Sequence, residues 1–259
     1  MLKPTTQGGD LVRERWMLQH SAPDGVSTAY VYTIPSPGSG AASHRDLAQG
    51  APADLSLITV RLPGRESRFS EPLLLDMEAV VAECVENIGR HARDHSKPFL
   101  LLGDCSGAFI AYEVARRLER DGPASAGLGV LGQVAPGAWD TSSPMADLPG
   151  DRFRTALLEA EIVSADIAAS PDRFAFFTPV LRADLRVVEL YEWKPEPAPG
   201  FPVVVFVDKD ADATEQENMR AWTGATRGMV EIVLFPEAEA GRVEVIGAEL
   251  ARLLSVSGC

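Results

Sequence analysis

Residues 103–107 read Gly-Asp-Cys-Ser-Gly and place Cys105 between two glycines, one two positions before it and one two positions after it. This spacing is typical of a nucleophile elbow, a sharp turn from a strand into a helix in which the glycines remove side chains that would clash. A helix start favours a thiolate, whereas the adjacent carboxylate of Asp104 disfavours it. The motif predicts a nucleophilic cysteine, and the alternative is a buried thiol that only packs.

The flanks of this motif predict the two elements that an elbow joins. Residues 99–102 are an apolar run of the length of a buried strand, and residues 108–120 repeat apolar positions at a helical period. Further strand-like runs, at residues 29–34, 55–62, 128–134, 202–208 and 229–235, alternate with helical patterns. This alternation predicts an α/β fold with a mostly parallel central sheet and helices on both faces.

One segment, about residues 137–195, departs from the alternation. It contains short amphipathic pieces and no strand-like run, so we expect a helical lid inserted into a single domain that spans residues 1–259. After the lid, Thr214 is the expected N-cap of the helix between the last two strands.

Composition and charge exclude several classes of protein. The chain of 259 residues is 46% hydrophobic, and 24 Lys and Arg against 37 Asp and Glu give a formal charge of -13. This composition excludes a disordered chain, and the charge argues against nucleic acid and anionic membranes as partners. The first residues lack a signal-peptide pattern and no apolar run is long enough to span a membrane, so we expect a cytoplasmic protein.

The three cysteines differ in their expected roles. Cys84, Cys105 and Cys259 are far apart and lack metal-ligand spacing, so we expect neither a disulfide framework nor a metal site. Cys84 lies in the apolar stripe of a helical pattern and is expected to pack in the core. Cys105 is thus the candidate for chemistry.

Four separate segments resemble the stand-alone type II thioesterases that serve polyketide synthases and nonribosomal peptide synthetases. They read VRLPGRESRFSEPL, KPFLLLGDCSGAFIAYEVARRLE, PVLRADLRVVELYEWKPEP and FPVVVFVDKDADAT, and their order and spacing hold over about residues 16–254. The resemblance implies an α/β-hydrolase fold with a helical lid. It also implies an acyl thioester substrate on the phosphopantetheine arm of an acyl or peptidyl carrier protein, with no bound cofactor.

The chain departs from the family pattern at positions that bear on catalysis. Family members usually carry Ser at the position of Cys105 and His at the position of Asp104. Their catalytic His lies in a segment like Phe-Pro-Gly-Gly-His, where residues 235–239 of this chain read Phe-Pro-Glu-Ala-Glu. The catalytic His of the family is therefore absent from its expected position.

The four histidines of the chain all precede the elbow. His91 and His95 are expected on the charged, exposed end of a helix. His44 follows a glycine-rich loop and is the one histidine considered as a partner of Cys105, with a surface position as the alternative.

Two acidic residues are candidate partners by their correspondence to the family. Asp210 matches the register of the acidic triad member, and Glu239 stands where the family has its His. The Glu239 carboxylate could act as a general base, although repulsion from Asp210 would leave one of the two protonated. The alternative for Asp210 is a solvated loop carboxylate.

The family's oxyanion hole implies two backbone donors. One is the N–H of Ser106, and the other belongs to the loop at residues 35–40, which reads Pro-Ser-Pro-Gly-Ser-Gly. Pro37 has no N–H, so the second donor is expected at Gly38 or Ser39, or is missing. In the segment VRLPGRESRFSEPL, two arginines (Arg65 and Arg68) are expected either to dock an acidic carrier protein or to be solvated loop charges.

These residues favour one function and leave two alternatives. The favoured hypothesis is transfer of a carrier-bound polyketide or peptide chain to Cys105, followed by release through intramolecular cyclisation. The elbow resembles that of cysteine-bearing cyclases that form tetramate or pyridone rings by Dieckmann condensation. The alternatives are a type II editing thioesterase that hydrolyses stalled thioesters, and a catalytically degenerate module that binds the carrier or its acyl chain.

Overall fold

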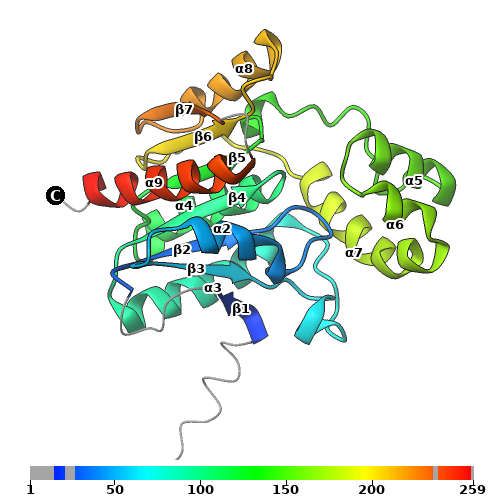
Figure 1. Ribbon diagram of the computed structural model, residues 1–259, viewed down its shortest axis with the longest axis horizontal. Helices are drawn as coiled ribbons and strands as arrows, with labels where there is room; N and C mark the ends of the chain where they lie inside the picture. The colour runs from blue at the N-terminus through cyan, green and yellow to red at the C-terminus, as the bar shows by residue number, and fades with distance from the viewer. Residues whose placement is uncertain (1–14, 21–26, 236–238, 258–259) are drawn as a thin grey trace, which may run out of the picture.

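The computed structural model describes residues 15–20, 27–235 and 239–257, and its centre is a seven-stranded sheet (Figure 1). The strand order is β1-β3-β2-β4-β5-β6-β7. The strands are β1 (Met17–Gln19), β2 (Ala29–Ile34), β3 (Leu55–Val60), β4 (Phe99–Asp104), β5 (Leu128–Leu131), β6 (Val203–Val207) and β7 (Val230–Leu234). β1 is antiparallel to β3, and the other neighbours are parallel. The predicted mostly parallel sheet is confirmed.

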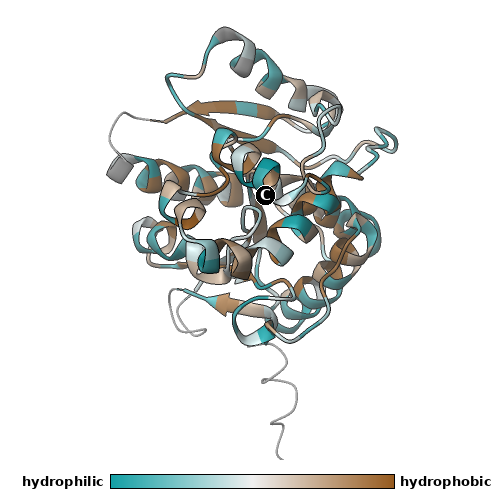
Figure 2. Cartoon of the chain, turned by 90° about the vertical axis from the view of Figure 1, so that its right-hand side faces the viewer, coloured by the Kyte–Doolittle hydropathy of each residue, from teal (hydrophilic) through white to brown (hydrophobic). Residues whose placement is uncertain are grey.

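Helices cover both faces of the sheet, and strands β2, β3, β4 and β6 are buried along almost their whole length. On one face, α3 (Met77–His95) and α4 (Gly107–Asp121) pack on Tyr30 and Tyr32, and on the other, α2 (Arg45–Gly50) and α9 (Glu239–Ser257) pack on Val31. Successive residues of β2 therefore point to opposite helical layers. Figure 2 shows hydrophilic residues interleaved with hydrophobic ones along the helices, the pattern of helices that cover a core.

The segment expected to form a lid holds helices and no strand. Its helices are α5 (Gly150–Glu159), α6 (Ala165–Ala169) and α7 (Pro171–Glu189). They share a hydrophobic cluster of their own, which includes Phe153, Leu157, Phe174, Leu181 and Leu185. In Figure 1 these helices lie to one side of the sheet.

Two local features differ from the predictions. The sequence pattern does not predict the antiparallel strand β1, because three residues are too few to show the alternation of a strand. The helix α8 (Ala213–Arg220) contains Thr214 and does not start after it. Asp212 Oδ1 accepts a hydrogen bond from the N–H of Thr214 at 2.8 Å, so a carboxylate just ahead of the helix has the capping role assigned to Thr214.

Cys84 is fully buried in the core, as predicted, and burial raises the pKa of its thiol to about 12. Within the ranges described, no helix is both long and apolar enough to cross a membrane. The same ranges hold no group of three or more His, Cys, Asp and Glu side chains arranged for a metal ion.

Candidate active site

Cys105 lies in the turn between β4 and α4 with a φ of 49°, in the left-handed region that side chains rarely adopt. The flanking glycines make this turn possible. A Cβ on Gly103 would lie 2.2 Å from the Cα of Ala108, and one on Gly107 would lie 2.6 Å from the carbonyl oxygen of Pro35. The Cys105 N–H donates to the carbonyl of Leu131 on β5 at 3.0 Å. The strand, the turn and the helix thus meet the requirements of a nucleophile elbow.

Burial raises the pKa of the Cys105 thiol, and the negative charge of Asp104 raises it further. The backbone N–H of Ser106 donates a hydrogen bond to the sulfur and lowers the pKa, but burial is the larger effect. The thiol is half-buried. The thiolate is the nucleophilic form of cysteine, and this environment disfavours it.

His44 is buried and lies beside the elbow, so the expectation of a surface position is wrong. Its Nε2 is 3.7 Å from Asp104 Oδ2, and its Nδ1 is 2.8 Å from Thr33 Oγ1 on β2. The Nε2 atom is buried without a hydrogen-bond partner in the part of the chain that the structure describes. A short 3-10 helix at residues 41–44 turns this side chain inward, which periodicity alone does not reveal.

His91 is also buried, contrary to the expected exposed helix end. Its Nδ1 lies 2.6 Å from the hydroxyl of Tyr32, and its ring stacks on that of His95 with the centroids 4.0 Å apart. The side chain belongs to the core face of α3. These two histidines therefore have a packing role on the helix.

The structure does not test the pairing predicted for the two acidic candidates. Asp210 is exposed in the turn after β6, and Glu239 begins α9 with a side chain that lies outside the described part. The carboxylate that ties this loop to α9 is instead Asp208, which forms an ion pair with Arg242. The roles assigned to Asp210 and Glu239 therefore stay predictions.

The oxyanion loop is engaged by the lid. The N–H of Gly38 donates to Asp184 Oδ2 of α7 at 2.8 Å, and the N–H of Ser39 donates to the carbonyl of Ser36 at 3.0 Å. Both candidates for the second donor thus have acceptors within the chain. Sequence reasoning missed Asp184, because it is 146 residues away from Gly38 and nothing local marks the contact.

Arg65 and Arg68 are buried, so neither is a solvated charge or an open docking surface. Arg65 forms two hydrogen bonds with Asp184, at 2.9 and 2.7 Å. Arg68 pairs with Glu71 at 2.5 Å and with Glu83 at 2.8 Å. The two guanidinium groups hold the loop after β3 to the lid and to α3.

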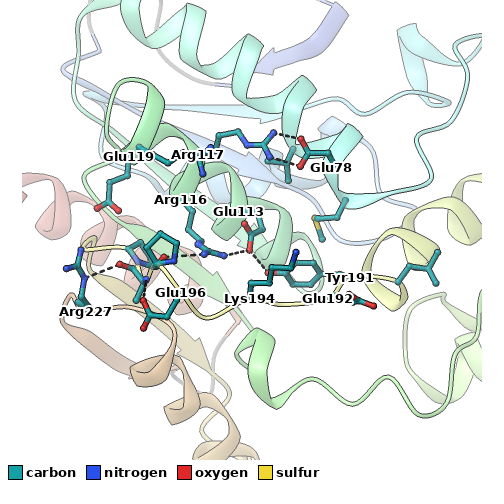
Figure 3. Close-up of a pocket in the computed structure, with 17 residues that line it drawn as sticks. Glu78, Glu113, Arg116, Arg117, Glu119, Tyr191, Glu192, Lys194, Glu196 and Arg227 are labelled. Carbon is teal, nitrogen blue, oxygen red and sulfur yellow. Dashed lines mark hydrogen bonds and ion pairs between the residues drawn. The ribbon is translucent and has the colours of Figure 1, made fainter.

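A groove of about 760 Å³ runs along α4 and residues 190–199, and its lining includes none of the predicted site residues. Figure 3 shows two pairs of charged side chains in it, Arg117 with Glu78 and Arg116 with Glu113. Glu113 accepts hydrogen bonds from Arg116 at 2.8 Å and from the hydroxyl of Tyr191 at 2.5 Å, and Arg117 pairs with Glu78 at 2.5 Å. No cysteine, serine or threonine is among the described residues that line this groove.

Comparisons with known proteins agree with the fold. A family model described as "Thioesterase domain" matches residues 30–252. The chain is 25% identical over 207 residues to the gramicidin S biosynthesis protein GrsT of Aneurinibacillus migulanus, and the match covers 80% of each chain.

Solved structures show the same architecture. The RedJ thioesterase from the prodiginine biosynthetic pathway in Streptomyces coelicolor matches with a TM-score of 0.75 and 25% identity, over 90% of this chain and 88% of that chain. YbtT, a type II thioesterase from the yersiniabactin NRPS/PKS pathway, matches with a TM-score of 0.78 and 22% identity, over 93% and 99%. The likeness to YbtT shows the fold.

Proposed function

Because this chain belongs to the thioesterase domain family, we propose that it off-loads acyl chains from a carrier protein in polyketide or nonribosomal peptide biosynthesis. The family match confirms the resemblance that four sequence segments indicate. The names of similar proteins, from gramicidin S, prodiginine and yersiniabactin biosynthesis, support this pathway class. The substrate of the proposal is an acyl thioester on the carrier's phosphopantetheine arm.

The position of Cys105 in the elbow carries the proposal of a cysteine nucleophile. In the first step, the Cys105 thiolate attacks the carbonyl carbon of the substrate thioester. The bond from that carbon to the pantetheine sulfur breaks, and the departing thiolate takes a proton from solvent. One thioester replaces another, so the acyl group stays activated on the protein.

The proposed second step is release by cyclisation. A carbon of the bound chain that lies between two carbonyl groups loses a proton to solvent, and the resulting carbanion attacks the acyl carbon so that a carbon–carbon bond forms. The bond to Cys105 Sγ breaks, and a ring of the tetramate or pyridone type leaves. No histidine follows Cys105 in the sequence, so the base that activates water in the family is absent, and an acidic carbon needs a weaker base than water does.

Two other functions are each favoured by a specific observation. Similarity to proteins named as thioesterases favours hydrolytic editing. The engagement of Gly38 and Ser39 N–H groups within the chain favours a binding module without turnover, because it leaves the oxyanion loop without the predicted second donor.

The test is intact-protein mass spectrometry with a pantetheine thioester that ends in a β-ketoamide. Wild type is compared with Cys105→Ala, and Cys84→Ala serves as the control because that thiol is fully buried. The proposal expects an acyl adduct on wild type and on Cys84→Ala but none on Cys105→Ala.

Analysis of the released product separates the three functions. A product that lacks one water relative to the free acid supports cyclisation, whereas the free acid itself supports hydrolytic editing. If no adduct and no product form while an acylated carrier protein still binds, the chain is a binding module and the proposal is wrong.

A further inference from the structure

A row of polar side chains crosses the sheet and ends at the elbow. Three hydrogen-bonded contacts make up the row: His20 Nε2 to Thr59 Oγ1 at 2.9 Å, Thr59 Oγ1 to Thr33 Oγ1 at 2.7 Å, and Thr33 Oγ1 to His44 Nδ1 at 2.8 Å. Beyond it, His44 Nε2 faces Asp104 Oδ2 at 3.7 Å. The proposed acyl transfer to Cys105 does not by itself account for this row.

Burying the hydroxyl groups of this row costs free energy unless they form hydrogen bonds. Thr33 and Thr59 are fully buried and are register partners on the parallel strands β2 and β3. A buried hydroxyl is stable only when its donor and acceptor capacities are met. Each hydroxyl has one proton to donate, so the direction of one hydrogen bond fixes the direction of the next.

His20 sets this direction. Burial lowers the pKa of His20, so its ring is neutral at neutral pH, and its ring also hydrogen-bonds the backbone of Ala41. A neutral ring that donates to a carbonyl leaves Nε2 as an acceptor. The hydroxyl of Thr59 then donates to His20, and that of Thr33 donates to Thr59.

The last donor of the row is therefore the Nδ1–H of His44, which donates to Thr33. Its Nε2 is left to bind a proton opposite the Asp104 carboxylate. We propose that His44 is a positioning residue that binds this proton, forms an ion pair with Asp104, and so favours the thiolate of Cys105. This role rests on the proposed function of Cys105 and deepens it.

The proposed effect of His44 on Cys105 is electrostatic. The negative charge of Asp104 disfavours a second negative charge on the neighbouring sulfur, and an imidazolium on His44 opposes that effect. Cys105 releases its proton to solvent while His44 retains its own, so the step moves one proton and no electrons.

Other charged groups surround this part of the fold. Arg45 follows His44 directly. His44 and Arg45 both lower the pKa of His20, and Glu66 raises it, each by less than burial does. Glu66 is itself paired with Arg61 at 2.5 Å and accepts a hydrogen bond from the Ala42 N–H at 3.3 Å. Asp104 is the one acidic side chain that the structure pairs with His44 among the residues described.

The test measures the rate at which iodoacetamide alkylates Cys105 as a function of pH, with intact mass identifying the modified residue. His44→Gln is expected to move the midpoint of this profile to higher pH, so that alkylation at pH 7.5 slows about fivefold. His95→Gln, at the C-terminal end of α3, is the matched control and is expected to leave the profile unchanged.

A double-mutant cycle tests whether Asp104 mediates the effect. Asp104→Asn removes the charge that His44 opposes, so His44→Gln added to it is expected to change the rate less than twofold. An equal slowing in both backgrounds would mean that His44 does not act through Asp104, and no slowing in either would also overturn the proposal.

Thr33→Val keeps the shape of the side chain and removes the acceptor of the His44 N–H. It is expected to shift the profile in the same direction as His44→Gln, and it replaces that variant if His44→Gln fails to fold. Iodoacetamide needs no carrier or acyl chain, so a shifted profile in a protein that never forms an acyl adduct would refute the proposed function alone.

Discussion

The carboxylate of Asp184 on α7 accepts a hydrogen bond from the backbone N–H of Gly38 at 2.8 Å. A residue of the lid thus fixes the loop that follows β2, next to the elbow. Asp184 is held in turn by two hydrogen bonds from Arg65. While the hydrogen bond between Gly38 and Asp184 is formed, the lid and the loop after β2 are coupled in their motion.

Asp184→Ala is expected to lower the free energy of unfolding by about 3 kcal/mol, because it leaves the buried guanidinium of Arg65 without its ion-pair partner. Urea denaturation measures the change. Asp147→Ala is the control. Asp147 forms an exposed ion pair with Arg186, which lies on α7 as Asp184 does, and losing this pair is expected to lower the free energy of unfolding by less than about 1 kcal/mol. If both variants lost the same free energy of unfolding, the buried pair of Arg65 and Asp184 would stabilise the fold no more than an exposed ion pair does.

Gly103→Ala is expected to destabilise the fold by about 2 kcal/mol or more. The added Cβ would lie 2.2 Å from the Cα of Ala108, and backbone must move to relieve such a clash. Gly150→Ala, at a glycine with nothing within 4 Å of an added Cβ, is expected to change stability by less than about 0.5 kcal/mol. Thermal denaturation compares the two, and a wild-type melting temperature for Gly103→Ala would contradict the required close approach.

The parts of the fold that could be predicted are those written in local patterns. Residues 29–34 form β2 with the predicted bounds, because aromatic and β-branched residues run there without interruption up to Pro35. The elbow between β4 and α4 follows from a strand run, two glycines and a helical period. The resemblance to thioesterases added the α/β-hydrolase architecture, and the similar structures agree with it.

The contacts around Cys105 could not be predicted, because they join residues far apart in the chain. Arg65 and Asp184 are 119 residues apart, and their types alone fit solvated charges equally well. The burial of His44 depends on a 3-10 helix too short to leave a periodic pattern. The polar row that reaches it depends on the register of β2 and β3, which places Thr33 opposite Thr59.

His20 predicts a pH dependence of stability. Its pKa in the folded chain is lowered by burial from the ordinary value of 6.5. Between the two values the unfolded chain binds more protons, so the free energy of unfolding rises with pH there, and stability is lost as pH falls below about 6.5. His20→Gln is expected to lose less stability than wild type between pH 7.5 and pH 5.5. Urea midpoints at both pH values measure this, and identical losses would contradict it.

Cys105→Ser is the substitution that would restore the residue usual in this family, yet we expect it to slow covalent acylation strongly. A serine hydroxyl attacks a thioester only when a base removes its proton, and the sequence has no histidine at residues 235–239 or anywhere after Cys105. A thiol ionises far more readily and can react without that base. We expect at least about a hundredfold slower acylation by a pantetheine thioester, measured by the adduct mass over time, with melting temperature as a check on folding. The expectation is contradicted if the serine variant forms the acyl adduct, and then hydrolyses it, as fast as the wild type reacts. That result would mean that a base outside the described contacts activates the serine, and it would favour hydrolytic editing over cyclisation.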